Sequence, residues 1–484
     1  MNLPWAGIDT VKLAGRFGLP LHLYDARRIT DNLQAFQSVF QEAGIRGQAC
    51  YAVKACGFPE IIGLAARAGT GADVASEYEL AAALEAGITP EKLVIHGNAK
   101  SAAYFRQAVK LGALIAANHH TELDRIEAEA AGQRKTAPVL LRLSGFDLGS
   151  VTAKGIFTAG HWCKFGEPVA RVPALLSHIR QWPHIDLIGF HVHIGSQITE
   201  VEPYLKVMGE MAELAWLYRE IVGRPVGVLD LGGGFPVSYV DGRTWKSLQI
   251  KIRRQAREIH PHPGPPPSRG RGITLRSEYV TWERMTGGFR PDPETGKIDW
   301  QHWSGEKFYS ADPQEKLLAR LLNGKVLFQG KVERVTKVWE WIGHPRLIVE
   351  PGRAIVGDAG ITLARVVDVY PAAGGQPLVT LDLGIVNHGT GLVEPDLYSW
   401  TLANDVDRKD RLPFRAFVAG RLCFSGDLLS RYRISFPRKP APGDIAVIEK
   451  TGAYAPTFFA SRANGFPLPA TVLISKGQGG IKMI

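Results

Sequence analysis

The chain has 484 residues, more than one hydrophobic core usually holds, so we expect two domains. Its 45% hydrophobic and 21% charged residues are typical of globular proteins, and no apolar run is long enough to span a bilayer. Lysine and arginine exceed aspartate and glutamate by 57 to 47 without forming a long basic run, which favours a solvated basic surface over a nucleic-acid site.

The first twenty residues lack the charged-then-apolar layout of a signal peptide, so we expect a cytoplasmic location. The four cysteines, Cys50, Cys56, Cys163 and Cys423, form no CxxC pair, and free thiols are predicted. The same first residues could join a domain built by the end of the chain, because chain termini often meet.

Eight apolar runs of the kind that form buried strands come next, with helix-period segments between them. The predicted strands are Gln48–Val53, Gly71–Ala75, Leu93–His96, Ala113–Ala117, Val139–Leu143, Leu187–His193, Val226–Leu231 and Leu347–Val349. The predicted helices are Pro59–Ala68, Glu77–Ala86, Ala102–Leu111, Leu123–Ala131, Pro173–Gln181 and Pro203–Ile221. This order favours a parallel sheet covered by helices, and eight strands suit a (β/α)8 TIM-like barrel. A doubly wound sheet has the same local pattern and is the alternative.

The gap between the seventh and eighth strands is far longer than a connection in such a fold needs. It holds a proline-rich stretch, His260–Ser268, and then three tryptophans, so we predict a partly ordered insertion at about 245–330. Past Arg353 the pattern changes to β-type runs at Ile361–Tyr370, Leu378–Leu383, Phe414–Ala419 and Ala446–Glu449. The expected division is a barrel over 24–350 and a β-rich domain formed by 1–23 plus 351–484.

Polar residues stand at the carboxyl ends of the predicted strands, where barrel enzymes carry their catalytic groups. Lys54 ends the first strand, and Arg142 lies in the fifth. His191–Ser196 closes the sixth strand, Gly232–Gly234 follows the seventh, and Glu350–Arg353 follows the eighth. A lysine at the end of a buried strand is usually ion-paired, but here the other strand ends supply what a pyridoxal phosphate (PLP) Schiff base requires.

Each of these groups has a possible task in PLP chemistry and an ordinary alternative. Glycines after a strand let backbone N–H groups approach a phosphate, although a plain tight turn also uses them. Glu350 could keep a pyridine nitrogen protonated or pair with Arg353, and His193 could stack on the ring or sit in the core. Zinc hydrolases also carry a His-x-His pair such as His191 and His193, but the later strand ends lack further ligands of that kind, so no metal is predicted.

Taken together, these segments resemble the fold-type III PLP-dependent decarboxylases, the superfamily of diaminopimelate and ornithine/arginine decarboxylases. The matching segments are Tyr51–Ala55, Asp73–Glu77, His96–Asn98, His191–Gln197, Leu229–Pro236, Glu350–Arg353, Cys423–Asp427 and Gly452–Tyr454. The resemblance implies an alanine racemase-like barrel, a C-terminal β-rich domain and a homodimer with shared active sites. It implies no nucleic-acid or membrane partner.

The resemblance also implies a role for each matching residue. Lys54 would bind PLP covalently, His193 would stack on its ring, and Glu350 would pair with the ring nitrogen. Cys423, from the partner subunit, would protonate the carbanion at Cα after CO2 leaves. The implied cofactor-binding set is Lys54, Asp73, Arg142, His193, Ser196, Gly232, Gly233, Gly234, Glu350, Gly352, Arg353 and Tyr454.

Two departures concern the substrate. Diaminopimelate decarboxylases carry Cys-Glu-Ser and Arg-Pro-x-x-Tyr, whose glutamate and arginine meet the distal amine and carboxylate; this chain has Phe424 and Glu394 there. We therefore expect decarboxylation of an amino acid, or of a metabolite derived from one, other than diaminopimelate. The expected substrate-binding residues are Arg353, Glu394, Tyr398, Phe424 and Tyr454. Diaminopimelate decarboxylation is the alternative, and a catalytically silent relative is the second.

Overall fold

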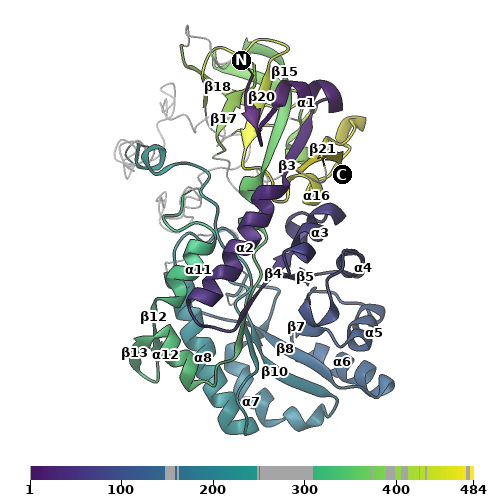
Figure 1. Cartoon of the computed structure of the whole chain (residues 1–484), viewed down its shortest axis with the longest axis vertical. Helices are drawn as coiled ribbons and strands as arrows, with labels where there is room; N and C mark the ends of the chain where they lie inside the picture. The colour runs from purple at the N-terminus through teal and green to yellow at the C-terminus, as the bar shows by residue number, and fades with distance from the viewer. Residues whose placement is uncertain are drawn as a thin grey trace, which may run out of the picture. The chain divides into compact units, whose positions relative to one another are not determined.

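The structure is a computed structural model. It describes residues 2–484 except 148–157, 161–162, 248–249, 251–308, 373–374, 389–397, 405–411, 425, 431–432 and 476–479. The chain divides into two compact units (Figure 1). The barrel unit comprises Ala26–Val237 and Ser310–Ala359, and the β unit comprises Met1–Asp25, Ser238–Tyr309 and Gly360–Met483, as far as these are described. Most of the predicted insertion at about 245–330 lies outside the described residues.

The barrel unit is built on eight parallel strands that close into a ring. They are β4 (Gly47–Ala52), β5 (Gly71–Val74), β6 (Leu93–Ile95), β7 (Leu114–Ala117), β8 (Ala137–Ser144), β10 (Ile185–His191), β11 (Val228–Asp230) and β14 (Arg346–Val349). Each pairs with the next, β14 pairs with β4, and β10 pairs with β8 as well as with β11. The ring therefore has no free edge, and the predicted (β/α)8 barrel is confirmed over the doubly wound alternative.

The interior of the barrel is packed with side chains. A cluster that includes Cys50, Val94, Leu140, Val228 and Ile348 fills it, and each of these residues is at most 4% exposed. Such a barrel is a solid core, so functional groups can gather only at its ends.

Helices follow most strands and cover the outside of the barrel (Figure 1). They are α2 (Ala26–Glu42), α3 (Pro59–Arg67), α4 (Glu77–Glu85), α5 (Ala102–Leu111), α6 (His120–Gln133), α7 (Val172–Ser177), α8 (Glu202–Val222), α11 (Glu315–Leu322), α12 (Val335–Trp341) and α13 (Arg353–Val356). Side chains cap several of them at the strand ends: Ser76 Oγ accepts from Glu79 N in α4, and Ser101 Oγ accepts from Tyr104 N in α5. The caps fix the short loops in which the strand-end residues lie. A hairpin of β12 (Lys325–Phe328) and β13 (Lys331–Arg334) also packs on this unit.

The β unit contains an open sheet in the order β19-β18-β16-β15-β3-β21-β22, and β20 joins β15 to β17. Its strands are β3 (Leu21–Asp25), β15 (Gly360–Pro371), β16 (Pro377–Leu381), β17 (Trp400–Leu402), β18 (Phe414–Ala419), β19 (Ile434–Phe436), β20 (Ile445–Glu449), β21 (Ala470–Ser475) and β22 (Gly480–Met483). Short elements complete it: β1 (Pro4–Trp5), β2 (Ile8–Asp9), α1 (Thr10–Phe17), α14 (Ile385–His388) and α16 (Ala455–Phe458). Strand β3 lies between β15 and β21, so the two ends of the chain share one sheet.

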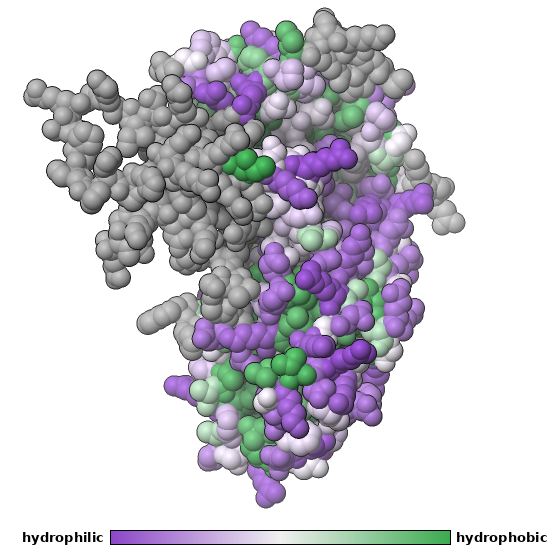
Figure 2. Space-filling view, turned by 90° about the vertical axis from the view of Figure 1, so that its left-hand side faces the viewer, coloured by the Kyte–Doolittle hydropathy of each residue, from purple (hydrophilic) through white to green (hydrophobic). Residues whose placement is uncertain are grey.

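The described surface is mainly hydrophilic, with hydrophobic side chains scattered among polar ones on the face in Figure 2. None of the described helices combines the length and the apolar character that crossing a bilayer requires.

Candidate active site

Lys54 lies just past the end of β4, in the single turn Val53–Ala55. Its Nζ donates to Asp73 Oδ2 over 3.1 Å, and Asp73 is buried on the neighbouring strand β5. The lysine side chain is 38% exposed, whereas that of Asp73 is 1% exposed. A buried carboxylate therefore holds the ammonium group of a partly exposed lysine side chain.

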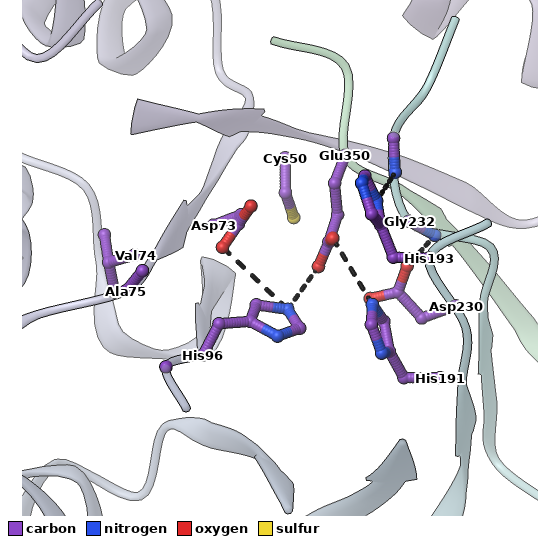
Figure 3. Close-up of polar contacts among 12 residues, drawn as sticks. Cys50, Asp73, Val74, Ala75, His96, His191, His193, Asp230, Gly232 and Glu350 are labelled. Carbon is purple, nitrogen blue, oxygen red and sulfur yellow. Dashed lines mark hydrogen bonds and ion pairs between the residues drawn. The ribbon is translucent and has the colours of Figure 1, made fainter. Parts of the chain in front are cut away.

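Glu350 follows β14 and is the centre of a buried polar cluster (Figure 3). His96 Nε2 lies 2.5 Å from Glu350 Oε1, and His191 Nε2 lies 3.4 Å from Glu350 Oε2. Asp230, at the end of β11, completes the cluster and is fully buried. Four strand ends thus direct two imidazoles and two carboxyl groups at one another.

The two carboxyl groups of this cluster ionise differently. Burial and the neighbouring Glu350 charge raise the pKa of Asp230 well above its ordinary value. Burial alone would also raise the pKa of Glu350, but His96 and His191 more than offset it and hold that pKa well below its usual range. Burial lowers the pKa of His191 to about 3, although the Glu350 charge opposes this. Of the two carboxyl groups, Glu350 therefore ionises at the lower pH and Asp230 keeps its proton to the higher pH.

His193 faces the glycine turn after β11. Gly233 N–H donates to His193 Nδ1 over 3.0 Å, and burial together with the positive charges of Lys54 and Arg142 keeps the pKa of His193 well below 6.5. The ring is thus neutral, with its proton on Nε2. A flat, uncharged imidazole is fixed beside Lys54.

Gly232, Gly233 and Gly234 form a turn with no room for side chains. Cβ atoms added there would lie 2.5 Å from Val192 O, 2.5 Å from Glu350 O and 2.6 Å from Tyr204 Oη, respectively. Gly232 and Gly234 also have φ of +63° and +98°, which glycine adopts readily. Close packing of the turn against its neighbours therefore requires glycine at all three positions.

Two arginines lie in the barrel unit at this site. Arg353 Nη2 donates to Ser196 Oγ over 3.2 Å, joining the loops after β14 and β10. Arg142, on β8, stacks on the ring of Phe165 at 4.2 Å from the centroid, and its Nε has no hydrogen-bond partner among the described residues. Both guanidinium groups could meet an anion.

Gly352, at the start of α13, also lies in the barrel unit, whereas the other predicted residues belong to the β unit. Cys423 is an exposed free thiol whose backbone N–H donates to Asn464 Oδ1, and Phe424 beside it is 57% exposed. Tyr398 is buried against the rings of Tyr239 and His388. Tyr454 adopts φ of +68° at the start of α16. Glu394 lies outside the described residues.

The structure adds residues that were not among the predicted site residues. His96, His191 and Asp230 surround Glu350, and Tyr204 Oη donates to Gly233 O over 2.8 Å from within α8. His96, His191 and Asp230 could have been predicted from their positions at strand ends. The sequence around Tyr204 contains no feature that predicts its contact with the glycine turn. The ligand atoms of His96, His191, Asp230 and Glu350 lie within 4.8 Å of one another, so these four side chains could share protons or reach one metal ion.

A family model described as "Pyridoxal-dependent decarboxylase, pyridoxal binding domain" matches residues 26–265. Diaminopimelate decarboxylase of Halalkalibacterium halodurans is 27% identical over 483 residues, which cover 99% of this chain and 91% of that protein. The enzyme of the same name from Pseudomonas aeruginosa is 27% identical over 452 residues, or 93% of this chain and 86% of that protein.

Solved structures share the fold. Diaminopimelate decarboxylase from M. jannaschii in co-complex with L-lysine has a TM-score of 0.75 at 22% identity, covering 99% of this chain and 91% of that one. The Helicobacter pylori enzyme, complexed with L-lysine, has a TM-score of 0.69 at 22% identity, covering 98% and 95%. The likeness extends over both units of the chain.

Proposed function

Because this chain belongs to the PLP-dependent decarboxylases of fold type III, we propose that it decarboxylates diaminopimelate to L-lysine. The observation that carries the proposal is the alignment of almost the whole chain with diaminopimelate decarboxylases from several bacteria. Loss of one carboxyl group from diaminopimelate yields lysine. Two solved diaminopimelate decarboxylases that share the fold of this chain are complexes with L-lysine.

The sequence-based expectation of a different substrate is wrong. It is overturned by the diaminopimelate decarboxylases that align along this chain, and it rested on only two positions, Phe424 and Glu394. In the single chain Phe424 is 57% exposed, so it does not wall a pocket of its own subunit. Glu394 lies outside the described residues. Single substitutions at a substrate's distal end are weak evidence when the rest of the site is retained.

The barrel site fits PLP. Gly234 and Gly352 have backbone N–H groups that donate to no described residue, and a Cβ at either would collide with its surroundings. Such groups suit a phosphate that must approach the backbone closely. The partly exposed amine of Lys54 suits a covalent bond to an aldehyde, and ionised Glu350 suits a protonated ring nitrogen.

Bound here, PLP supplies a conjugated ring that accepts the electron pair left at Cα when CO2 departs. Lys54 would hold it covalently, and Asp73 keeps the Lys54 amine in place through the 3.1 Å contact. His193, neutral and held by Gly233, would lie against the ring face. Ser196, Gly234 and Gly352 would contact the phosphate.

The substrate's carboxylate would meet the arginines of the barrel unit. Arg353 presents a planar guanidinium that suits a carboxylate. The thiol of Cys423 of the partner subunit would deliver the proton to Cα after CO2 leaves, so the proposed active form is a homodimer. The exposure of the Cys423 thiol supports this role, because an exposed thiol can reach a molecule bound to another subunit.

The test is an assay of purified protein with meso-diaminopimelate, monitoring CO2 and lysine. We expect lysine formation that requires added PLP and is abolished in Lys54→Ala. L-ornithine and L-arginine, the substrates of the other branches of the superfamily, are the controls and should react far more slowly. Turnover of either at a higher kcat/KM than diaminopimelate would refute the proposal.

A further inference from the structure

Glu350 is surrounded by groups that no part of the proposed function has used. Its Oε1 meets His96 Nε2 at 2.5 Å, and its Oε2 lies 3.4 Å from His191 Nε2 (Figure 3). The His96 and His191 side chains are only 7% and 1% exposed. They come from the ends of β6 and β10, on opposite sides of β14 in the barrel order. One carboxylate therefore has an imidazole at each of its oxygens.

The contacts fix which group donates. An ionised carboxylate accepts hydrogen bonds only, so His96 presents Nε2–H to Oε1, while His191 Nε2 faces Oε2 at 3.4 Å without a hydrogen bond. His96 Nε2 also lies 3.9 Å from Asp73 Oδ1, and Asp73 holds Lys54. A continuous line of polar groups thus runs from Lys54 through Asp73 and His96 to Glu350.

We propose that His96 and His191 are positioning residues that fix Glu350 as an ionised carboxylate aimed at the pyridine nitrogen of the cofactor. The hydrogen bond from His96 and the polar contact with His191 stabilise the negative charge where burial would otherwise neutralise it. They also place an imidazole at each carboxylate oxygen, His96 hydrogen-bonded to Oε1 and His191 at 3.4 Å from Oε2, and so restrict rotation of the side chain. The depressed pKa of Glu350 and the raised pKa of Asp230 agree with this division of charge.

This inference rests on the contact between Glu350 and the ring nitrogen that the proposed function assigns. The contact between Glu350 and the ring nitrogen would then depend on histidines from two other strands. If the histidines served only as core packing, their loss would weaken the fold and the binding of any ring of this shape equally. The ring nitrogen itself is therefore the feature to vary.

The experiment compares the affinity of the apoenzyme for PLP and for its 1-deaza analogue, in which a C–H replaces the ring nitrogen. Wild type should bind PLP at least about tenfold more tightly than the analogue, the usual effect of a hydrogen bond to a charged group. His96→Met and His191→Met should lose most of this preference, because PLP affinity falls and analogue affinity changes little. His96→Gln, whose amide can replace the Nε2–H donor, should retain it.

A matched control is His120→Met. His120 Nδ1 lies 2.9 Å from Glu167 Oε2, a histidine–carboxylate contact of the same kind in the same unit but without contact to Glu350. The His120→Met variant should prefer PLP over the 1-deaza analogue to the same extent as wild type. Should His96→Met fail to fold, His96→Asn makes the same comparison, because its shorter amide leaves Oε1 without the donor.

If each histidine variant loses affinity for PLP and for the analogue by the same factor, the inference is overturned and the two histidines are packing residues. Glu350→Met separates this failure from failure of the proposed function. If Glu350→Met loses the preference and the histidine variants keep it, only the positioning role is wrong. If wild type itself shows no preference, the contact assigned to Glu350 is wrong.

Discussion

The backbone N–H of Gly233 donates a 3.0 Å hydrogen bond to Nδ1 of His193. One residue of the glycine turn thereby sets the tautomer of an imidazole that lies 40 residues earlier in the chain, after the preceding strand. The hydrogen bond requires the turn to approach the His193 ring closely. Glycine permits this approach, because a Cβ on Gly233 would lie 3.3 Å from His193 Cε1. The turn and the ring form one rigid unit.

Replacing Gly234 with alanine should damage this unit. The added Cβ would lie 2.6 Å from Tyr204 Oη and 2.8 Å from Gly195 O, at a φ of +98° that alanine tolerates poorly. We expect PLP affinity to fall by tenfold or more and the melting temperature to drop. The control is Gly132→Ala on α6, where nothing lies within 4 Å of the new Cβ, and where a rise in stability of up to about 1 kcal/mol is expected.

Asp230→Asn tests the protonation of the buried cluster. The pKa of Asp230 is raised in the folded state, whereas in the unfolded state the carboxyl group loses its proton near pH 3.8. Above pH 3.8 the folded protein therefore holds a proton that the unfolded chain has released. As a result, the free energy of unfolding falls as the pH rises from 3.8 toward the folded pKa. Asparagine has no such cost and can still accept from Gly232 N–H. We expect Asp230→Asn to gain unfolding free energy over wild type between pH 4 and 7. A loss that grows with pH would show that Asp230 is ionised.

The sequence predicted the barrel well because its strands are buried on both faces and its helices are strongly periodic. All eight predicted strands overlap an observed one, and Ala102–Leu111 is reproduced as α5. The partners of Glu350 could not be predicted in this way, because His96 lies 254 residues away and only closure of the ring brings the two together. Helix α2 was not predicted, and β3 joins a sheet whose other strands lie more than three hundred residues later.

The β unit should lose stability in mild acid. Burial lowers the pKa of His22 to about 4 and that of His388 to about 3. Below pH 6.5 the unfolded chain gains protons that these folded histidines cannot accept, so stability falls from pH 6.5 toward those values by about 1.4 kcal/mol per pH unit for each group. His388→Leu should flatten this slope in urea unfolding measured from pH 7 to 5. An unchanged slope would place the titrating groups elsewhere.

Reduction with borohydride should fix PLP on Lys54. Its Nζ is the amine that Asp73 holds at the open side of the site, and its side chain is 38% exposed. Peptide mapping of the reduced protein should find the adduct on the peptide that contains Lys54, and Lys54→Ala should bind PLP without forming it. An adduct on another lysine would contradict the site. Loss of turnover in Lys54→Ala should be complete, because no other nucleophile replaces it there.

The last prediction concerns the assembly. If Cys423 acts on the active site of the partner subunit, then Lys54→Ala and Cys423→Ala are each inactive as homodimers, but a mixed dimer combines the intact Lys54 of one subunit with the intact Cys423 of the other. One of its two sites is then complete. Random mixing of equal amounts gives half of the dimers in the mixed form, so about a quarter of the wild-type activity should return. A tagged subunit recovered with its untagged partner verifies the exchange. The matched control is a Lys54→Ala, Cys423→Ala double variant mixed with wild type, because no mixed dimer then gains a complete site. Proven subunit exchange without recovered activity in the first mixture would place Cys423 in its own subunit's site or outside the reaction.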